Sequence, residues 1–279
     1  MNDFCHIHVH THYSALDGLG KPREYVKRAK ELGQPAIAIT DHGTTSGIYD
    51  MQKEGDKQGV KILLGSEFYI HDERVDKLGH LVVLAKNNNG LKNIYKLQEK
   101  ACVDNFYYKP RINIDMLKEH FTDLVVTSAC LANPIARLIV EGQYSLAKEM
   151  ALEFKELFGE DFYLEIQPND IPEQLILNKA LIRMSKEIGI QLVASNDVHY
   201  TYKSDGELKE YKDGIMYSPH EVLLALQSKK KLDDEKRFRF SVQDYWLKSK
   251  EEMLEGFNGL PEEYVRKAME NTMIIANKC

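Results

Sequence analysis

A chain of 279 residues with 43% hydrophobic and 29% charged residues has an ordinary globular composition, and is long enough for one large α/β barrel or two smaller domains. Its formal net charge of −6 argues against non-specific binding of a polyanion over the whole surface, so any nucleic acid would be held locally. No apolar run approaches the roughly 20 residues that span a bilayer, and no signal peptide is recognisable. The four cysteines show no C-x-x-C spacing, and we therefore expect a cytoplasmic protein in a reducing compartment.

Short apolar strands alternate with amphipathic helices along the first 195 residues. Strands are expected at 5–10, 35–40, 60–70, 80–85, 123–129, 162–167 and 190–195. Helices are expected at 22–32 and at about 90–102, 132–140 and 143–157. Two more are expected to follow the strands at 35–40 and 162–167 and to end at about 58 and 188. Continuous apolar strands that alternate with helices predict a parallel sheet covered on both faces, and seven such strands favour a closed barrel over an open sheet.

Four of the chain's ten histidines occupy alternate positions around the first expected strand. His6, His8, His10 and His12 are followed by Asp17 in a glycine-bounded turn. Because alternate side chains of a strand point to the same face, this spacing aims several imidazoles at one point. Neutral imidazole with a carboxylate suits Zn, Mn or Fe. The alternative is a polar surface strand that includes an expression tag, but a tag would be a contiguous histidine run.

Further polar residues follow other expected strands at or just beyond their carboxyl ends, where barrel enzymes build their active sites. They are Asp41 and His42, Glu67, Cys130, and Asp197 with His199. His80 instead begins its strand, and it fits only if that strand is short, antiparallel or distorted. Alone, His42 could belong to a helix cap and Cys130 could be a small buried hydrophobe, whereas Glu67 on an apolar strand needs a partner or a metal.

Several motifs occur in order along nearly the whole chain. They are HVHTHYSALDG, ITDHG, GSE, GHLVVLA, FYYKPRI, SACL and ASNDVHY, followed by HEVLLALQSKKKLDD, RFRFSVQDYWLKSKEEM and NTMIIANKC. Together they resemble the PHP (polymerase and histidinol phosphatase) domain, in the version at the amino end of the bacterial DNA polymerase III alpha subunit. The resemblance implies an α/β fold, a distorted (β/α)7 barrel with a metal cluster at the carboxyl ends of its strands.

The resemblance also implies a complete set of metal ligands and a cofactor of three divalent ions (Zn²⁺, Mn²⁺ or Fe²⁺). The implied ligands are His8, His10, Asp17, His42, Glu67, His80, Cys130, Asp197 and His199. Within this set, Glu67, His10 and Asp197 would form the catalytic centre, with metal-activated hydroxide as the nucleophile. Asp41, just before His42, is expected to orient a ligand without binding the metal itself.

The implied activity is a metal-dependent phosphoesterase, specifically a 3′→5′ proofreading exonuclease of a replicative polymerase. Its partners would be the 3′ end of single-stranded DNA and the rest of the polymerase and replisome, with no membrane and no polymerase activity in this chain. Two alternatives remain open: a small-molecule phosphatase of the histidinol phosphatase type, and a non-catalytic structural module. The polymerase-like residues after Pro219 argue against the first, and the intact ligand set argues against the second.

Two basic segments are candidates for substrate binding. Lys109 and Arg111, beside Tyr107 and Tyr108, combine cations with aromatic faces that can hold phosphates and stack a base. Packing of these tyrosines against the barrel is an equal alternative. The second segment contains Lys229–Lys231, Lys236, Arg237 and Arg239. Acidic residues dilute it, and a solvated charged face is the better interpretation.

We expect one domain over residues 1–279. It would comprise a core barrel over about 1–203, an exposed insertion over about 203–218 that is longer than the family usually has, and a C-terminal extension over 219–279. In the family, this extension leads toward a polymerase palm.

Overall fold

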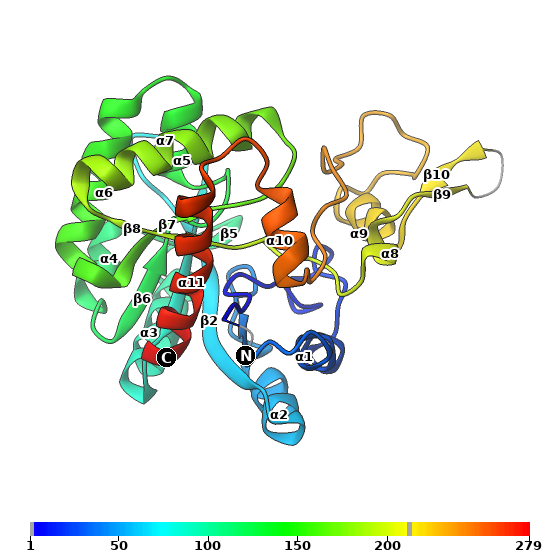
Figure 1. Ribbon diagram of the computed structural model, residues 1–279, viewed down its shortest axis with the longest axis horizontal. Coiled ribbons are helices and arrows are strands. Elements are labelled where there is room, and N and C mark those ends of the chain that lie inside the picture. The colour runs from blue at the N-terminus through cyan, green and yellow to red at the C-terminus, as the bar shows by residue number, and fades with distance from the viewer. Residues whose placement is uncertain (1–2, 211–213) are drawn as a thin grey trace.

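A computed structural model describes residues 3–210 and 214–279 as a curled mixed sheet wrapped by helices (Figure 1). The main sheet contains β1 (Ala36–Ile39), β2 (Lys61–Ile70), β3 (Gly79–Ala85), β4 (Phe106–Tyr107), β5 (Lys109–Ile112), β6 (Leu124–Thr127), β7 (Phe162–Ile166) and β8 (Gln191–Ala194). The helices of the barrel are α1 (Pro22–Glu31), α2 (Ile48–Gln58), α3 (Asn88–Val103), α4 (Ile114–Glu119), α5 (Pro134–Val140), α6 (Tyr144–Phe158) and α7 (Pro172–Ile188), with a short 3₁₀ turn at Gly159–Asp161. The expected strands and helices after residue 30 are thus confirmed to within a few residues.

Beyond the barrel lie α8 (Lys203–Gly206), the antiparallel pair β9 (Lys209–Glu210) and β10 (Met216–Tyr217), α9 (Pro219–Gln227), α10 (Lys250–Gly256) and α11 (Glu262–Lys278). In Figure 1, α8, α9, β9 and β10 project from the side of the barrel, whereas α11 returns along the sheet. The expected insertion at 203–218 includes residues 211–213, which lie outside the described residues.

The prediction of a purely parallel sheet is wrong at β3. This strand pairs antiparallel with both β2 and β6, whereas β1 with β2, β6 with β7 and β7 with β8 are parallel. Only a short connection without a helix separates β2 from β3, and such a connection returns a strand antiparallel to its neighbour. His80 at the start of β3 therefore lies opposite Tyr69, near the carboxyl end of β2. Of the three conditions under which His80 is expected to fit, a short, antiparallel or distorted strand, the structure shows the antiparallel one.

The first expected strand, at 5–10, is an irregular extended segment that closes the sheet. On one side, Ala38 N donates to His6 O (2.8 Å) and Thr40 N donates to Val9 O (2.9 Å). On the other side, the backbone beyond β8 pairs with it, where His10 N donates to Val198 O (2.7 Å). Because one segment bonds to both margins of the curled sheet, the predicted distorted barrel is confirmed.

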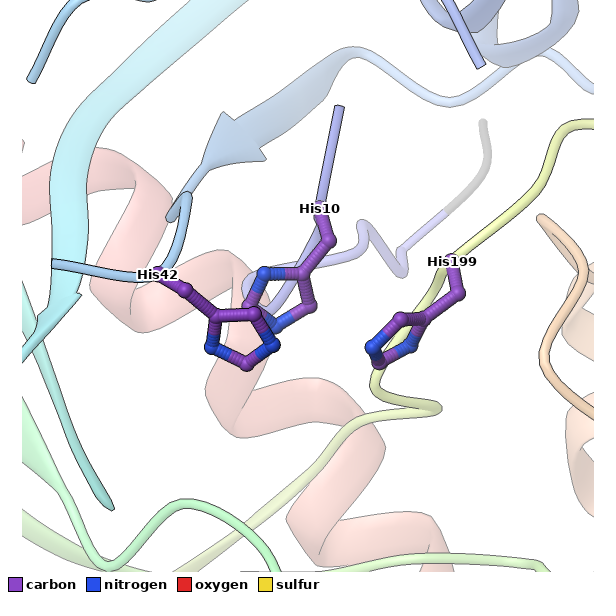
Figure 2. Close-up of side chains that lie close together, drawn as sticks. All are labelled: His10, His42 and His199. Atoms are coloured by element: carbon purple, nitrogen blue, oxygen red, sulfur yellow. The ribbon is translucent and has the colours of Figure 1, made fainter. Parts of the chain in front are cut away.

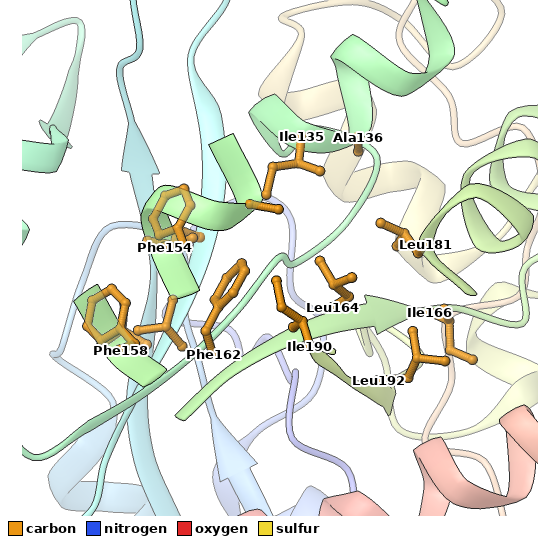
Figure 3. Packing of buried hydrophobic residues seen from close by; sticks show 14 of the residues in the cluster. Ile135, Ala136, Phe154, Phe158, Phe162, Leu164, Ile166, Leu181, Ile190 and Leu192 are labelled. Atoms are coloured by element: carbon orange, nitrogen blue, oxygen red, sulfur yellow. The ribbon is translucent and has the colours of Figure 1, made fainter. Parts of the chain in front are cut away.

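The hydrophobic core has separate inner and outer parts. Figure 3 shows the outer part, where Phe154 of α6 stacks on Phe162 of β7 with ring centroids 5.1 Å apart, and Leu181 of α7 lies near Leu164. Inside the barrel, buried apolar side chains of the strands meet Ile275 of α11. This apolar filling occupies one end of the barrel and leaves the carboxyl end to polar groups. Among the described residues, no helix is long and apolar enough to cross a membrane.

Candidate metal centre

The carboxyl end of the barrel gathers all nine of the side chains that the sequence resemblance singles out as metal ligands. Three subsets each place their ligand atoms within 4.8 Å of one another: His8 with His10 and Asp197, His10 with His42 and His199, and His42 with Glu67 and His80. Figure 2 shows the rings of His10, His42 and His199 converging from three separate segments of the chain. The subsets share members, so the three groups form one continuous cluster.

Glu67 lies at the centre of this cluster because β2 carries it inward near its carboxyl end. Its Oε1 is 3.1 Å from His8 Nε2, and its Oε2 is 2.5 Å from His42 Nδ1 and 3.2 Å from His80 Nδ1. Cys130 Sγ lies 3.8 Å from Glu67 Oε1 and 3.5 Å from His80 Nδ1. A carboxylate in contact with several imidazoles in this way is placed to bridge neighbouring cations.

Two other carboxylates complete the cluster from opposite sides. Asp197 Oδ1 is 3.2 Å from His8 Nε2 and 3.1 Å from His10 Nε2. Asp17 Oδ2 is 3.0 Å from His42 Nε2 and 3.7 Å from His199 Nε2. The turn after residue 12 therefore brings Asp17 back to the histidines, as the sequence predicts.

Backbone strain is concentrated where the chain turns to present these groups. Asp197 itself has a φ of 50°, Leu16 before Asp17 has 63°, and Ala129 before Cys130 has 47°. The left-handed region is costly for residues other than glycine and is typical of functional sites. Gly18 is required for a different reason, because a Cβ there would lie 2.0 Å from the carbonyl oxygen of Thr11. These turns fix the two aspartates and the cysteine against the strand ends.

A layer of hydrogen bonds behind the cluster orients its imidazoles. The Nδ1 of His8 lies 2.8 Å from the buried carboxylate of Glu165, and that of His199 lies 2.7 Å from the carbonyl oxygen of Asp197. The Nδ1 of His10 lies 3.0 Å from Ser14 Oγ. In each case the outward Nδ1 is bonded, which directs Nε2 into the cluster, as second-layer partners of metal-binding histidines do.

Asp41 contributes to this layer indirectly. Its Oδ1 accepts hydrogen bonds from Thr11 N (2.6 Å) and Ser14 Oγ (2.8 Å), and the same Ser14 hydroxyl contacts His10. Asp41 is thus connected to His10 through Ser14, whose hydroxyl also accepts a hydrogen bond from the backbone N of His42 (3.0 Å). Burial raises the pKa of Asp41, against the opposing effect of these hydrogen bonds.

The buried charges shift one another's proton affinities strongly. Burial opposes charge on Glu67, but the surrounding imidazoles of His80, His8 and His42 outweigh it and hold the pKa of this carboxyl well below its usual range. For His10, burial followed by repulsion from His42 lowers the pKa to about 3. Burial and the nearby carboxylate of Glu67 raise the pKa of the Cys130 thiol well above its usual range. Burial opposes charge on His42, but Glu67 and Asp17 outweigh it and raise the pKa of this imidazole to about 10. Without cations, protonated imidazoles therefore balance the carboxylates, and bound cations would displace those protons.

Four buried atoms of the cluster make no hydrogen bond of good geometry among the described residues: Asp17 Oδ1, His42 Nδ1, Glu67 Oε2 and Asp197 Oδ1. Three of them nevertheless lie in close ion-pair contacts, such as Glu67 Oε2 with His42 Nδ1. Buried polar atoms without well-directed hydrogen bonds are costly, and a bound cation would satisfy them. The mixture of imidazole, carboxylate and thiol donors suits Zn²⁺, Mn²⁺ or Fe²⁺. The residues present therefore fit a cluster of divalent ions.

Of the four alternating histidines, His8 and His10 point into the cluster as the spacing predicts, whereas His6 and His12 do not. His6 is buried, and its Nε2 lies 2.9 Å from Lys248 O, while His12 is exposed and packs against Tyr13. The segment is irregular, so the period of two does not hold along its length.

Two buried residues of the site, Glu165 and His220, are not among those singled out from the sequence. Glu165 follows Leu164 in an apolar strand, and only its inward direction beside His8 reveals its role. His220 stands in the extension, and its Nε2 lies 3.0 Å from Asp17 O. An inward carboxylate on a buried strand, like Glu67, was the available sign for Glu165.

Comparison with known proteins gives a consistent set of matches. The family described as PHP domain matches residues 6–169. DNA polymerase III subunit alpha of Borreliella burgdorferi is 39% identical over 285 residues, which cover 99% of this chain and 24% of that protein. The same subunit of Helicobacter pylori strain 26695 is 37% identical over 294 residues, 99% of this chain and 23% of that protein. The chain thus spans about a quarter of the length of the curated relatives it matches.

Among solved structures, a protein of Bifidobacterium adolescentis assigned as a metal-dependent phosphoesterase is similar to this chain. The TM-score is 0.48 and the sequence identity 17%, over 80% of this chain and 96% of that one.

Proposed function

The chain belongs to the PHP domain family, and from this premise we propose that it is a metal-dependent phosphoesterase that removes nucleotides from the 3′ end of single-stranded DNA. The observation that carries the proposal is the cluster of nine side chains at the carboxyl end of the barrel, four of whose buried atoms make no well-directed hydrogen bond among the described residues. Homology to DNA polymerase III alpha subunits along 99% of the chain favours a nucleic-acid substrate over a small phosphomonoester.

In this proposal the three groups of side chains in the cluster would together hold three divalent ions. His8, His10 and Asp197 would hold one ion, and Glu67 would contribute to neighbouring ions, since its two oxygens contact different histidines. The remaining ligands would be Asp17, His199, His42, His80 and Cys130. Bound divalent ions supply Lewis acidity to the phosphoryl group and lower the pKa of water to near neutrality.

The protein's own groups position both the cluster and the substrate. Glu165, Ser14 and the backbone carbonyl of Asp197 keep the three histidines in fixed orientations before a substrate arrives. Such pre-organisation means that no rearrangement is required when charge develops on the phosphate. The central place of Glu67, His10 and Asp197 among the contacts supports the catalytic roles proposed for them.

Lys109 is the cation best placed to hold a substrate phosphate. It lies on β5, with Nζ 5.1 Å from the centroid of the Tyr69 ring, and that ring lies 5.3 Å from the ring of His80. Arg111 contacts Tyr107 at 5.0 Å, and Tyr108 beside it is 83% exposed. Exposed aromatic rings with adjacent cations are the usual surface for single-stranded nucleic acid.

The relatives suggest where this activity would act. Because they are DNA polymerase III alpha subunits, we place the chain in a replisome, as one domain with a barrel over about 1–203 and an extension over 219–279 that connects to polymerase. The extension contributes His220 to the surroundings of Asp17, which favours one domain over two.

The test is a paired hydrolysis assay on the metal-loaded chain, with end-labelled single-stranded DNA and a phosphomonoester as substrates. We expect a nucleotide ladder that chelator abolishes and that Asp197→Asn reduces to background. Metal content measured by elemental analysis identifies the ions. Turnover of the monoester alone would point to a small-molecule phosphatase, and no turnover of either substrate with tightly bound metal would point to a structural module.

A further inference from the structure

A pocket of about 510 Å³ opens directly beside the cluster. Its inner wall includes Asp17, His42 and Asp197, so whatever occupies the pocket lies next to the proposed ions. A volume in this range matches pockets that bury a ligand the size of one nucleotide. The outer wall is formed by residues 238–241 and Tyr245, which follow α9 in the extension.

The outer wall presents a run of aromatic rings that leads away from the cluster. The ring of Phe240 lies 5.3 Å from that of His199, and the ring of Phe238 lies 5.5 Å from Phe240. Phe240 is held in place, because it stacks on His220 at 5.3 Å and lies 4.6 Å from Tyr245. Phe238 is 51% exposed. It therefore offers an open aromatic face at the end of a fixed support.

A cation stands beside this exposed ring. Arg239 also lines the pocket, and 43% of its side chain is exposed. It donates to Leu232 O at 3.3 Å and lies 3.9 Å from Glu221, whose carboxylate is already bound by the buried Arg237. The interpretation of this segment as a solvated charged face is thus wrong for Arg237, which is buried, whereas Arg239 is exposed as expected and also lines the pocket. Arg237 neutralises Glu221 and leaves the charge of Arg239 available.

The floor of the pocket is polar. The amide side chains of Gln167, Asn169 and Gln174 line it, and all three residues are buried. Gln167 is fixed by a hydrogen bond from its Nε2 to Glu165 (3.0 Å), and Gln174 by one to Asn178 (2.9 Å). A small number of oriented polar groups beside apolar side chains is typical of sites that bind one defined small ligand.

We propose that this pocket holds the terminal nucleotide of a single-stranded nucleic acid, with its base stacked on Phe238 and its phosphate contacted by Arg239. This inference rests on the proposed function, because it takes the scissile phosphate to lie at the cluster. Stacking on one exposed ring accepts any base, as an enzyme that shortens a strand of arbitrary sequence requires. Phe238 and Arg239 lie beyond residues 6–169, which the family model matches. In this proposal the contacts to the terminal base and its phosphate therefore come from the extension and not from the barrel.

The experiment compares two 5′-labelled oligonucleotides that differ only in the last residue, which either carries its base or lacks it. Dissociation constants for the full chain are measured by fluorescence anisotropy, with Ca²⁺ and with Mn²⁺, and cleavage is followed in parallel. We expect the complete terminus to bind about tenfold more tightly, equivalent to about 1.4 kcal/mol. Phe238→Ala should remove this difference and Phe238→Tyr should keep it. The control is Phe121→Ala, which replaces another exposed phenylalanine that lies just before β6 and does not line the pocket.

Each result has a distinct meaning. Equal affinity of the wild-type chain for the two termini, or a tenfold preference that survives Phe238→Ala, overturns the pocket assignment. A preference that depends on Phe238 without any cleavage supports the assignment and contradicts the proposed exonuclease activity. Cleavage of both oligonucleotides at equal rates, with equal affinities, supports the exonuclease and overturns the nucleotide pocket.

Discussion

The two ends of the barrel are filled in opposite ways. At one end, Ile275 of α11 packs among Cys5, Ala38 and Val193, and this apolar contact is excluded from water. At the other end, Glu67 is equally buried but is surrounded by imidazoles and other carboxylates. Burial of apolar surface stabilises the fold, whereas burial of ionisable groups costs free energy unless they are paired or bind metal. The comparison shows that the apolar end and the helical layers stabilise a polar end that is kept for chemistry.

The sharpest test of this contrast is His10→Ala. Because His10 belongs to two of the three possible metal groups, its loss should lower phosphoester hydrolysis by about a thousandfold. The matched control is His12→Ala, since His12 is exposed two residues further along the same segment. Activity is measured by release of labelled nucleotide at saturating metal. Similar rates for the two variants would contradict the assignment of the cluster.

At the apolar end, Ile275→Ala should lower the free energy of unfolding by about 3 kcal/mol, because it leaves a cavity inside the barrel. Ile274 is the adjacent control, since its side chain is 43% exposed and Ile274→Ala should change stability by less than about 0.5 kcal/mol. Urea denaturation measures both. The folded Ile275→Ala protein should retain its hydrolytic rate, and a parallel loss of activity would show that the two ends are not independent.

Glu165→Gln probes the layer behind the cluster. It removes the charge that holds the Nδ1 proton of His8, and should weaken metal binding by about 10- to 100-fold without unfolding the chain. Competition with a chelator of known affinity gives the metal dissociation constant. Glu263→Gln, at an exposed position of α11, is the control for loss of one acidic group. Unchanged metal affinity in Glu165→Gln would exclude an orienting role for this residue.

The smallest effect is a pH dependence at the apolar end. Burial raises the pKa of the Cys5 thiol from 9.0 to about 12. Below pH 9 the thiol is protonated in both states, but between pH 9 and 12 the unfolded chain loses the proton more readily. Stability should therefore fall with rising pH by at most about 1.4 kcal/mol per unit from this group.

Cys5→Ala should make the alkaline decline of stability shallower, and Cys102→Ala, at an exposed position, should leave it unchanged. Unfolding free energies at several pH values between 8 and about 11 provide the measurement. Equal slopes for Cys5→Ala and the wild-type chain would show that this thiol does not contribute.

Much of the fold could be predicted because its determinants are local. Local patterns indicate where strands and helices lie, for example the apolar runs at 36–39 and 191–194 and the prolines that begin α5 and α7. The direction of β3 was harder, since no apolar pattern distinguishes a parallel from an antiparallel neighbour. The irregularity of residues 5–10 also escaped prediction, because these residues bond to β1 and to Val198, which are distant in the sequence.

For the site, the sequence by itself determined which ligand types stand at which strand ends, and through the family motifs it indicated which of them belong together. The folded structure decided the rest: that Asp41 acts on His10 through Ser14, that His6 turns away to Lys248, and that Glu165 supports His8. The physical reason is separation along the chain. Glu165 lies 157 residues from His8, and no local periodicity encodes a hydrogen bond formed only when the barrel closes.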